Sequence, residues 1–218
     1  MNFKQLCTDV SKAADKECAK LMAAVMNEEF IFKGLDASAR SRIMQNQLAS
    51  DKDPDILDWE FIECCWDQNI REFQYFALSY LTEKRELLKK ADLSKLKQLV
   101  LAKPSWDTNN ILHKLINLHT AVYPELSETV ASWSESDNIW LKRVAVLYQL
   151  ERGEYINLNY ARKAIENSLD YPDHYLREAI KESLKDIKIT HPKFVDDLIF
   201  EHEDKLGKEI VEALKSDE

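Results

Sequence analysis

The sequence predicts an all-α protein in which pairs of helices repeat along the chain. Apolar residues recur at spacings of three and four residues in one segment after another, and no segment alternates in the manner of a β-strand. Proline, glycine and Asp-Pro signals separate these segments and indicate short connections. Three of the segments also share one pattern, which indicates an internal repeat.

In the first half of the chain, the apolar spacing predicts helices over 3–27, 39–49, 55–65, 70–81 and 93–102. A glycine follows the first of these helices, an Asp-Pro pair precedes the third, and a proline follows the fifth. Each of these residues disfavours the continuation of a helix, so the segments are expected to be separate helices.

In the second half, the same spacing predicts helices over 108–121, 125–133, 138–151, 159–168, 173–188 and 192–201. A proline stands at or just before the start of three of them, and Asp137 is expected to cap the one that begins at 138. Acidic side chains concentrate near the C-terminus, so we expect an acidic C-terminal helix over about 193–218. The whole chain, 1–218, is expected to form a single domain.

The repeated pattern occurs in REFQYFALSYL (71–81), WLKRVAVLYQL (140–150) and YLREAIKESLK (175–185). Each string has a bulky residue, a polar pair, and then small and apolar residues. The offsets correspond to two periods and one period of about 35 residues, and one helix pair per period is typical of a HEAT-like or TPR-like solenoid. The second helices of such pairs line a concave face, where arrays of this kind usually bind their ligand.

Composition excludes several classes of site. With only 3 glycines, the chain has neither GxGxxG nor GxxxxGK[ST], so a glycine-rich phosphate loop is excluded. The 4 cysteines have no metal-ligand spacing, which favours reduced thiols in a cytoplasmic protein and no metal site. No apolar run is long enough to span a membrane, and no secretory signal is visible. The net charge of −9 argues weakly against a polyanionic partner, because only the charge on the contacting face matters.

Arg143 interrupts an apolar pattern. Ile139 and Trp140 lie one turn before it and Val146 and Leu147 one turn after it, whereas Lys142 and Gln149 already supply a polar face. Two explanations remain open. The guanidinium either lines a groove and holds a phosphate, or it pairs with a carboxylate on a neighbouring helix.

A second candidate site lies in KPSWDTNN, where Trp106 stands just after a proline and just before a predicted helix. Asp107 is a plausible N-cap, and Thr108, Asn109 and Asn110 fill the first turn. Three polar residues at that place do not serve a core. The segment is therefore either a binding site or a solvated helix start anchored by Trp106.

Four strings together resemble the AlkD-like family of HEAT-repeat DNA glycosylases, the DNA alkylation repair enzymes. They are FIFKGLDASARSR (30–42), WDQNIREFQYFALSYL (66–81), KPSWDTNNI (103–111) and SDNIWLKRVAVLYQL (136–150). The similarity runs in order from about residue 20 to about residue 193. It implies a HEAT-like superhelix that binds duplex DNA in a cationic groove. It also implies hydrolysis of the N-glycosidic bond of cationic N3- and N7-alkylpurines without a metal or cofactor.

The resemblance carries over unevenly to single residues. Trp106 and Asp107 match the family pattern, and Ser105 stands in place of its first aromatic residue. The catalytic carboxylate of the family falls on Asn110, and a second aromatic residue falls on Glu182. Arg143 matches the phosphate-contacting arginine. Lys185 falls where a further basic residue is expected, so Arg143, Lys185 and Asp107 are the implied DNA-binding residues and Trp106, Asn110 and Glu182 the implied catalytic positions.

Three functions are therefore compared. The first is a DNA alkylation-repair glycosylase, acting as a cytoplasmic monomer on alkylated duplex DNA and away from membranes. The second is a non-catalytic relative that keeps the scaffold and binds DNA, because Asn110 and Glu182 replace a carboxylate and an aromatic residue. The third is a helical-repeat scaffold for protein partners, which the net charge of −9 would tolerate.

Overall fold

The structure, a computed structural model, describes residues 1–215, which form helices and loops with one isolated β-bridge between Ile31 and Ile70. The all-α fold expected from the sequence is confirmed. The chain forms two compact units, the first Met1–Lys89 and the second beginning at Lys90. That 1–218 forms a single domain stays a prediction. No helix within the described residues has the combined length and apolar character needed to cross a membrane.

The first unit contains α1 (Phe3–Lys12), α2 (Lys16–Val25), α3 (Ala37–Ala49), α4 (Trp59–Trp66), α5 (Arg71–Glu83) and the short 3₁₀ helix η1 (Arg85–Leu87). The prediction of one helix over 3–27 is wrong, because a new helix starts at Lys16. Asp15 caps it, and its carboxylate accepts hydrogen bonds from the backbone N–H groups of Glu17 and Cys18, both at 2.9 Å.

A buried carboxylate fixes the loop between α2 and α3. Glu72 is fully buried and accepts backbone hydrogen bonds from Lys33 at 2.9 Å, Gly34 at 2.7 Å and Leu35 at 3.2 Å. Gly34 has φ of 86°, and a Cβ atom there would lie 1.9 Å from the carbonyl oxygen of Asp15. Only glycine fits at this position.

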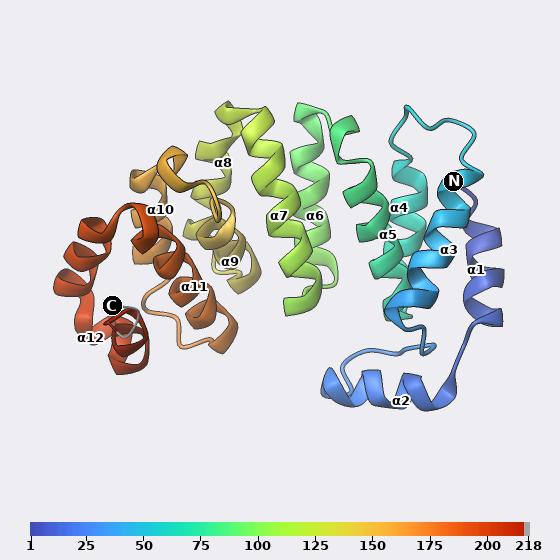
Figure 1. The fold of residues 1–218 in the computed structure, drawn as a ribbon, viewed down its shortest axis with the longest axis horizontal. Helices are drawn as coiled ribbons and strands as arrows, with labels where there is room; N and C mark the ends of the chain where they lie inside the picture. The colour runs from blue at the N-terminus through green and yellow to red at the C-terminus, as the bar shows by residue number, and fades with distance from the viewer. Residues whose placement is uncertain (216–218) are drawn as a thin grey trace. The chain divides into compact units, whose positions relative to one another are not determined.

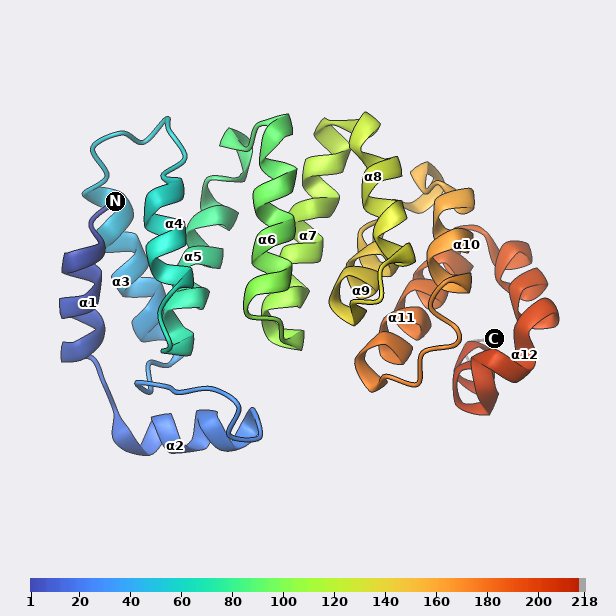
Figure 2. The same ribbon diagram turned by 180° about the vertical axis from the view of Figure 1, so that it is seen from behind.

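The second unit contains η2 (Lys90–Asp92), α6 (Leu93–Ala102), α7 (Trp106–Val122), η3 (Pro124–Leu126), α8 (Ser127–Ser132), η4 (Trp133–Glu135), α9 (Ile139–Leu147), η5 (Gly153–Tyr155), α10 (Leu158–Glu166), α11 (His174–Thr190) and α12 (Pro192–Lys215). Helix α9 packs against both α7 and α11, α8 and α10 pack against α9, and α12 packs against α11. Within this unit, α7, α9 and α11 follow one another in one layer and α8 and α10 lie in the layer behind (Figures 1 and 2).

Several helix boundaries in this unit differ from expectation. The helix predicted over 138–151 ends at Leu147, and the one predicted over 192–201 continues to Lys215. Asn138, not Asp137, caps α9, because its side-chain oxygen accepts from the backbone N–H groups of Trp140 at 3.0 Å and Leu141 at 3.1 Å. The acidic C-terminal helix is present as α12, but non-helical backbone at His202 and Gly207 divides it into shorter segments. The end of its predicted range, 216–218, lies outside the described residues.

Candidate nucleic-acid interface on helices α7, α9 and α11

Every residue of helix α9 and the following turn from Leu141 to Gln149 is buried, whereas Ile139 and Trp140 at the start of the helix are half-buried. The expectation that Lys142 and Gln149 form a polar surface face is therefore wrong. The Lys142 ammonium donates to the carbonyl oxygens of Ser134 at 2.5 Å and Asn167 at 2.8 Å, and burial lowers the pKa of Lys142. These contacts give Lys142 a role in folding.

Arg143, the next residue, is 6% exposed and is paired only with amide oxygens. Its Nη1 donates to Oδ1 of Asn109 at 2.7 Å, and its Nη2 donates to Oδ1 of Asn110 at 2.6 Å. Within residues 1–215, Nε has no partner and no carboxylate forms an ion pair with the guanidinium. The internal ion pair that the sequence left open as an explanation for Arg143 is thus absent from the described residues.

The charge of Arg143 is therefore only partly compensated. Burial lowers the pKa of Arg143, and the more distant carboxylates of Glu182 and Asp173 oppose this shift. Removing a guanidinium from water costs several kcal/mol, of which neutral acceptors recover only a part. An anion that reached this guanidinium would gain an attraction that no described carboxylate of the chain already satisfies.

Two asparagines in the first turns of α7 orient the guanidinium. The side-chain amide of Asn109 donates to the carbonyl oxygen of Trp140 at 3.3 Å, so its oxygen faces Arg143. The oxygen of Asn110 also faces Arg143, because a guanidinium only donates. The NH₂ group of Asn110 is then left without a partner among residues 1–215, and it can donate a hydrogen bond but cannot act as a base.

Aromatic residues are present on all three helices of this region. Trp106 is the first residue of α7, one turn before Asn110, and is half-buried. The rings of Trp140 on α9 and Tyr175 on α11 have centroids 5.6 Å apart, and His174 lies edge-on to Tyr175 at 5.4 Å. Sequence reasoning missed Tyr175. Its only signal was its spacing, two helical turns before Glu182.

The sequence-derived site residues are brought together in part. Asn110 and Arg143 are in direct contact, and Trp106 lies one turn before Asn110 on the same face of α7. Glu182 is exposed on α11 and acts on Arg143 electrostatically, and Lys185 is exposed one turn further along the same helix. Asp107 lies inside the first turn of α7 and its carboxylate accepts from the N–H of Thr108 at 2.7 Å, so it is not the N-cap; that position is Ser105. The functional roles assigned to these residues stay predictions.

The two central helices carry little negative charge although the whole protein is acidic. Helix α7 contains one carboxylate, that of Asp107, and α9 contains none. The same two helices contain the cations Lys114, Lys142 and Arg143. Helix α11 adds four cations and three carboxylates. The three helices together thus carry more cations than carboxylates, so the net charge of −9 is carried elsewhere and is a weaker objection to a polyanionic partner at these helices.

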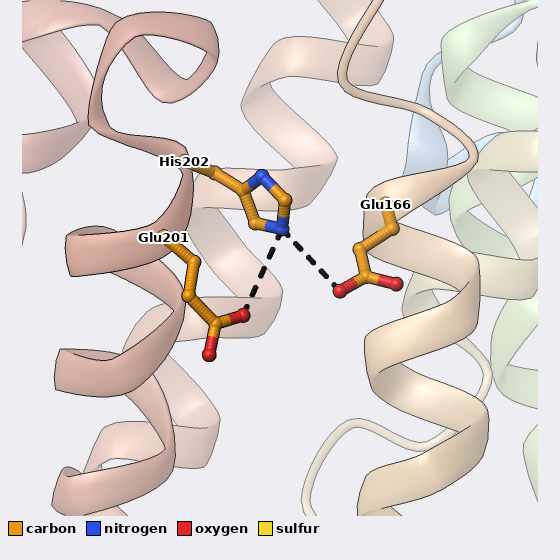
Figure 3. Close-up of side chains that lie close together, drawn as sticks. All are labelled: Glu166, Glu201 and His202. Carbon is orange, nitrogen blue, oxygen red and sulfur yellow. Dashed lines mark hydrogen bonds and ion pairs between the residues drawn. The ribbon is translucent and has the colours of Figure 1, made fainter.

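A separate group of metal-ligand side chains lies between α10 and α12, where Glu166, Glu201 and His202 offer atoms within 4.8 Å of one another (Figure 3). The His202 Nε2 lies 3.3 Å from Glu166 and 4.0 Å from Glu201. Arg162 pairs with the same carboxylates, at 3.1 Å from Glu166 and 2.6 Å from Glu201. Because a guanidinium already pairs with both carboxylates, the cluster is better suited to joining α10 to α12 than to holding a cation. The absence of a metal site stays a prediction.

Comparison with known proteins supports one family. The family model described as DNA alkylation repair enzyme matches residues 7–215. A solved structure titled as a predicted DNA alkylation repair enzyme from Enterococcus faecalis matches with a TM-score of 0.76 at 24% identity, over 86% of this chain and 89% of that chain. The likeness confirms the all-α helical-repeat fold expected from the sequence. No curated protein matches the chain.

Proposed function

Because this chain belongs to the DNA alkylation repair enzyme family, we propose that it binds alkylated duplex DNA through the surface formed by α7, α9 and α11. One observation carries the proposal. Arg143 is a buried cation whose described partners are two neutral amides. A phosphate oxygen is the anion that duplex DNA offers in quantity, at one charge per about 1.7 Å of helix axis.

The guanidinium can serve a phosphate without losing its asparagine partners. It has five N–H hydrogens, and Asn109 and Asn110 accept one each. The free NH₂ group of Asn110 adds a further donor beside the same position. A carboxylate at residue 110 would repel a phosphate, so the amide favours binding of the sugar–phosphate backbone.

The same amide limits excision of the base. An alkylpurine that already carries a positive charge is a good leaving group, and the enzyme then mainly stabilises the cationic sugar as the bond breaks. A unit charge pair at ~4 Å is worth about 4 kcal/mol at an effective dielectric constant of 20, and even half of this exceeds tenfold in rate. Asn110 supplies no such charge, so we propose that the chain binds the lesion and releases the base slowly or not at all.

Compartment and assembly are part of the same proposal. The four cysteines are free thiols in the structure, which fits a reducing compartment such as the cytoplasm. We further propose that the protein acts as a monomer and needs neither metal nor cofactor.

The proposal is tested by measuring affinity for a short duplex over a series of salt concentrations. We expect log K to fall linearly with log[salt], and Arg143→Gln to reduce the steepness by about 0.9. Lys193→Gln is the matched loss of charge, because Lys193 is 85% exposed and lies on α12, which is not one of the three helices of this surface. A slope near zero for the unmodified protein would refute DNA binding and favour a scaffold for protein partners.

Base release is measured separately on duplexes that contain 7-methylguanine. We expect 7-methylguanine to be released at close to the spontaneous rate, together with a salt-dependent affinity for the duplex. Rapid release would instead show that the chain is an active glycosylase despite Asn110.

A further inference from the structure

A second guanidinium is held against α7 in the same manner as Arg143. Arg152 follows the turn after α9, next to Glu151, whose φ of 64° lies in the left-handed region. Its Nε donates to Oδ1 of Asn117 at 2.7 Å, and its Nη2 donates to the Asn117 carbonyl at 3.0 Å and to Oγ1 of Thr120 at 2.6 Å. The guanidinium also lies 5.4 Å from the ring centroid of buried Tyr148.

The partners of Arg152 are themselves fixed. The side-chain NH₂ group of Asn117 donates to the carbonyl oxygen of Leu150 at 2.7 Å, which leaves its oxygen for Arg152. Asn109 uses its two ends in the same way, with its NH₂ group on Trp140 and its oxygen on Arg143. In both cases an asparagine of α7 binds a nearby backbone carbonyl and holds an arginine in one orientation.

No carboxylate neutralises Arg152 within the described residues. Burial lowers the pKa of Arg152, and the only opposing influence is Tyr148. Asp186 accepts from the backbone N–H of Glu151 at 3.1 Å, and Glu154 lies 3.6 Å from His191. The carboxylate of Glu151 is exposed and forms no ion pair with Arg152 among the described residues. The third nitrogen of the guanidinium, Nη1, has no hydrogen-bond partner within residues 1–215. It is not fully buried, so solvent reaches it.

The two arginines are held along one side of α7. Asn110 and Asn117 are seven residues apart, which places them on the same face about 10.5 Å apart at 1.5 Å per residue. Lys114 is exposed between them on the same helix. This row contains amides and cations, and the single carboxylate of α7, Asp107, lies before it.

From this geometry we infer that Arg152 is a second anion-binding site, which takes a backbone phosphate of the duplex that Arg143 contacts. The inference rests on the proposed function. A phosphate oxygen accepts from the free Nη1 of Arg152, while Asn117 and Thr120 keep the guanidinium in place. A purely structural role of Arg152 explains the hydrogen bonds of Nε and Nη2. It does not explain why Nη1 is accessible or why no described carboxylate pairs with the guanidinium.

Salt-dependent binding of an undamaged duplex separates this inference from the proposed function. Arg152→Gln should reduce the slope of log K against log[salt] by about 0.9, and the double variant with Arg143→Gln should reduce it by about 1.8. Arg152→Lys keeps the charge and should keep the slope. Lys193→Gln serves again as the control for the loss of a surface charge.

The outcomes divide cleanly. If Arg143→Gln lowers the slope and Arg152→Gln does not, the second site is refuted and the proposed function stands. If the unmodified protein shows no slope, the proposed function itself fails. Thermal unfolding of each variant shows whether it is folded.

A measurement on the unmodified protein applies even if Arg152→Gln does not fold. Phenylglyoxal modifies accessible guanidinium groups, and peptide mass spectrometry reports each site. Saturating duplex should slow modification of Arg152 severalfold and leave Arg162, which pairs with Glu166 and Glu201, unchanged. Equal rates at Arg152 with and without duplex would overturn the inference.

Discussion

Arg143 donates a hydrogen bond of 2.6 Å to the side-chain oxygen of Asn110, so the amide at residue 110 accepts from a buried cation. The family resemblance places a carboxylate at this position. In this chain the pair therefore keeps the geometry of an ion pair while carrying a net positive charge. Binding and catalysis are expected to respond in opposite directions when that charge is changed.

Asn110→Asp should convert the contact into an ion pair. A hydrogen bond to a charged group contributes about 1.5–3 kcal/mol, so the free energy of unfolding at neutral pH should rise. The salt dependence of DNA binding should weaken because Arg143 is neutralised, and release of 7-methylguanine should increase more than tenfold. Asn110→Ala, which removes the amide without adding charge, is the control. Base release that is the same in both variants would show that charge is not what this position lacks.

Glu182→Gln should strengthen DNA binding. Glu182 is exposed on α11 and acts electrostatically on Arg143, so its carboxylate opposes a phosphate that approaches the same guanidinium. Removal of one repulsive charge near the surface should raise the affinity severalfold at low salt, with a smaller gain at high salt. Glu203→Gln on α12, where Glu203 is 66% exposed, provides the matched control. An affinity unchanged relative to that control would place Glu182 outside the DNA-binding surface.

The sequence predicted most of the architecture but only part of the site. Helical spacing located the helices, and the strings around residues 110 and 143 placed these two residues together. The sequence pattern could not locate Tyr175 or Arg152 in the site, because their positions depend on how α11 packs on α9 and how the turn after α9 contacts α7. The spacing of apolar residues does not indicate these contacts between helices.

The polar residues of α9 show a second reason for failure. Lys142 occupies what helical spacing marks as a surface position, yet backbone carbonyls from two other segments enclose it. Conversely, the break between α1 and α2 had a local signal, since Asp15 followed by Glu17 is a typical helix start. The apolar spacing continues through these residues and hides this signal.

Stability should fall in mild acid because of His113. Burial, and then the charge of Arg143, lowers the pKa of His113 to about 3, and its Nδ1 has no partner within residues 1–215. The unfolded chain has a pKa near 6.5, so it binds more protons than the folded chain between these two values. The contribution is complete above about pH 6.5 and is lost as the pH falls toward 3, at up to about 1.4 kcal/mol per pH unit.

Denaturant unfolding at several pH values between 7 and 4.5 measures this effect. His113→Asn should show a shallower loss of unfolding free energy than the unmodified protein, whatever its stability at pH 7. His174→Asn alters an exposed histidine and should leave the slope unchanged. If the slope of His113→Asn equals that of the unmodified protein, His113 is not the group responsible.

Lys142 and Arg143 are adjacent buried cations with different predicted roles, and exchanging each for a neutral side chain separates them. Lys142→Met leaves the carbonyls of Ser134 and Asn167 without their donor, and each unsatisfied group costs roughly 1–3 kcal/mol. The unfolding midpoint should therefore fall, while the salt slope of DNA binding stays as it was. Arg143→Gln should lower the slope by about 0.9 and still donate to an asparagine oxygen. The two variants remove the same charge from neighbouring positions of one helix, so any difference in slope reports position alone. If both variants reduce the slope of log K against log[salt] equally, α9 contributes to binding only through its total charge. That result would refute a specific contact between Arg143 and a phosphate.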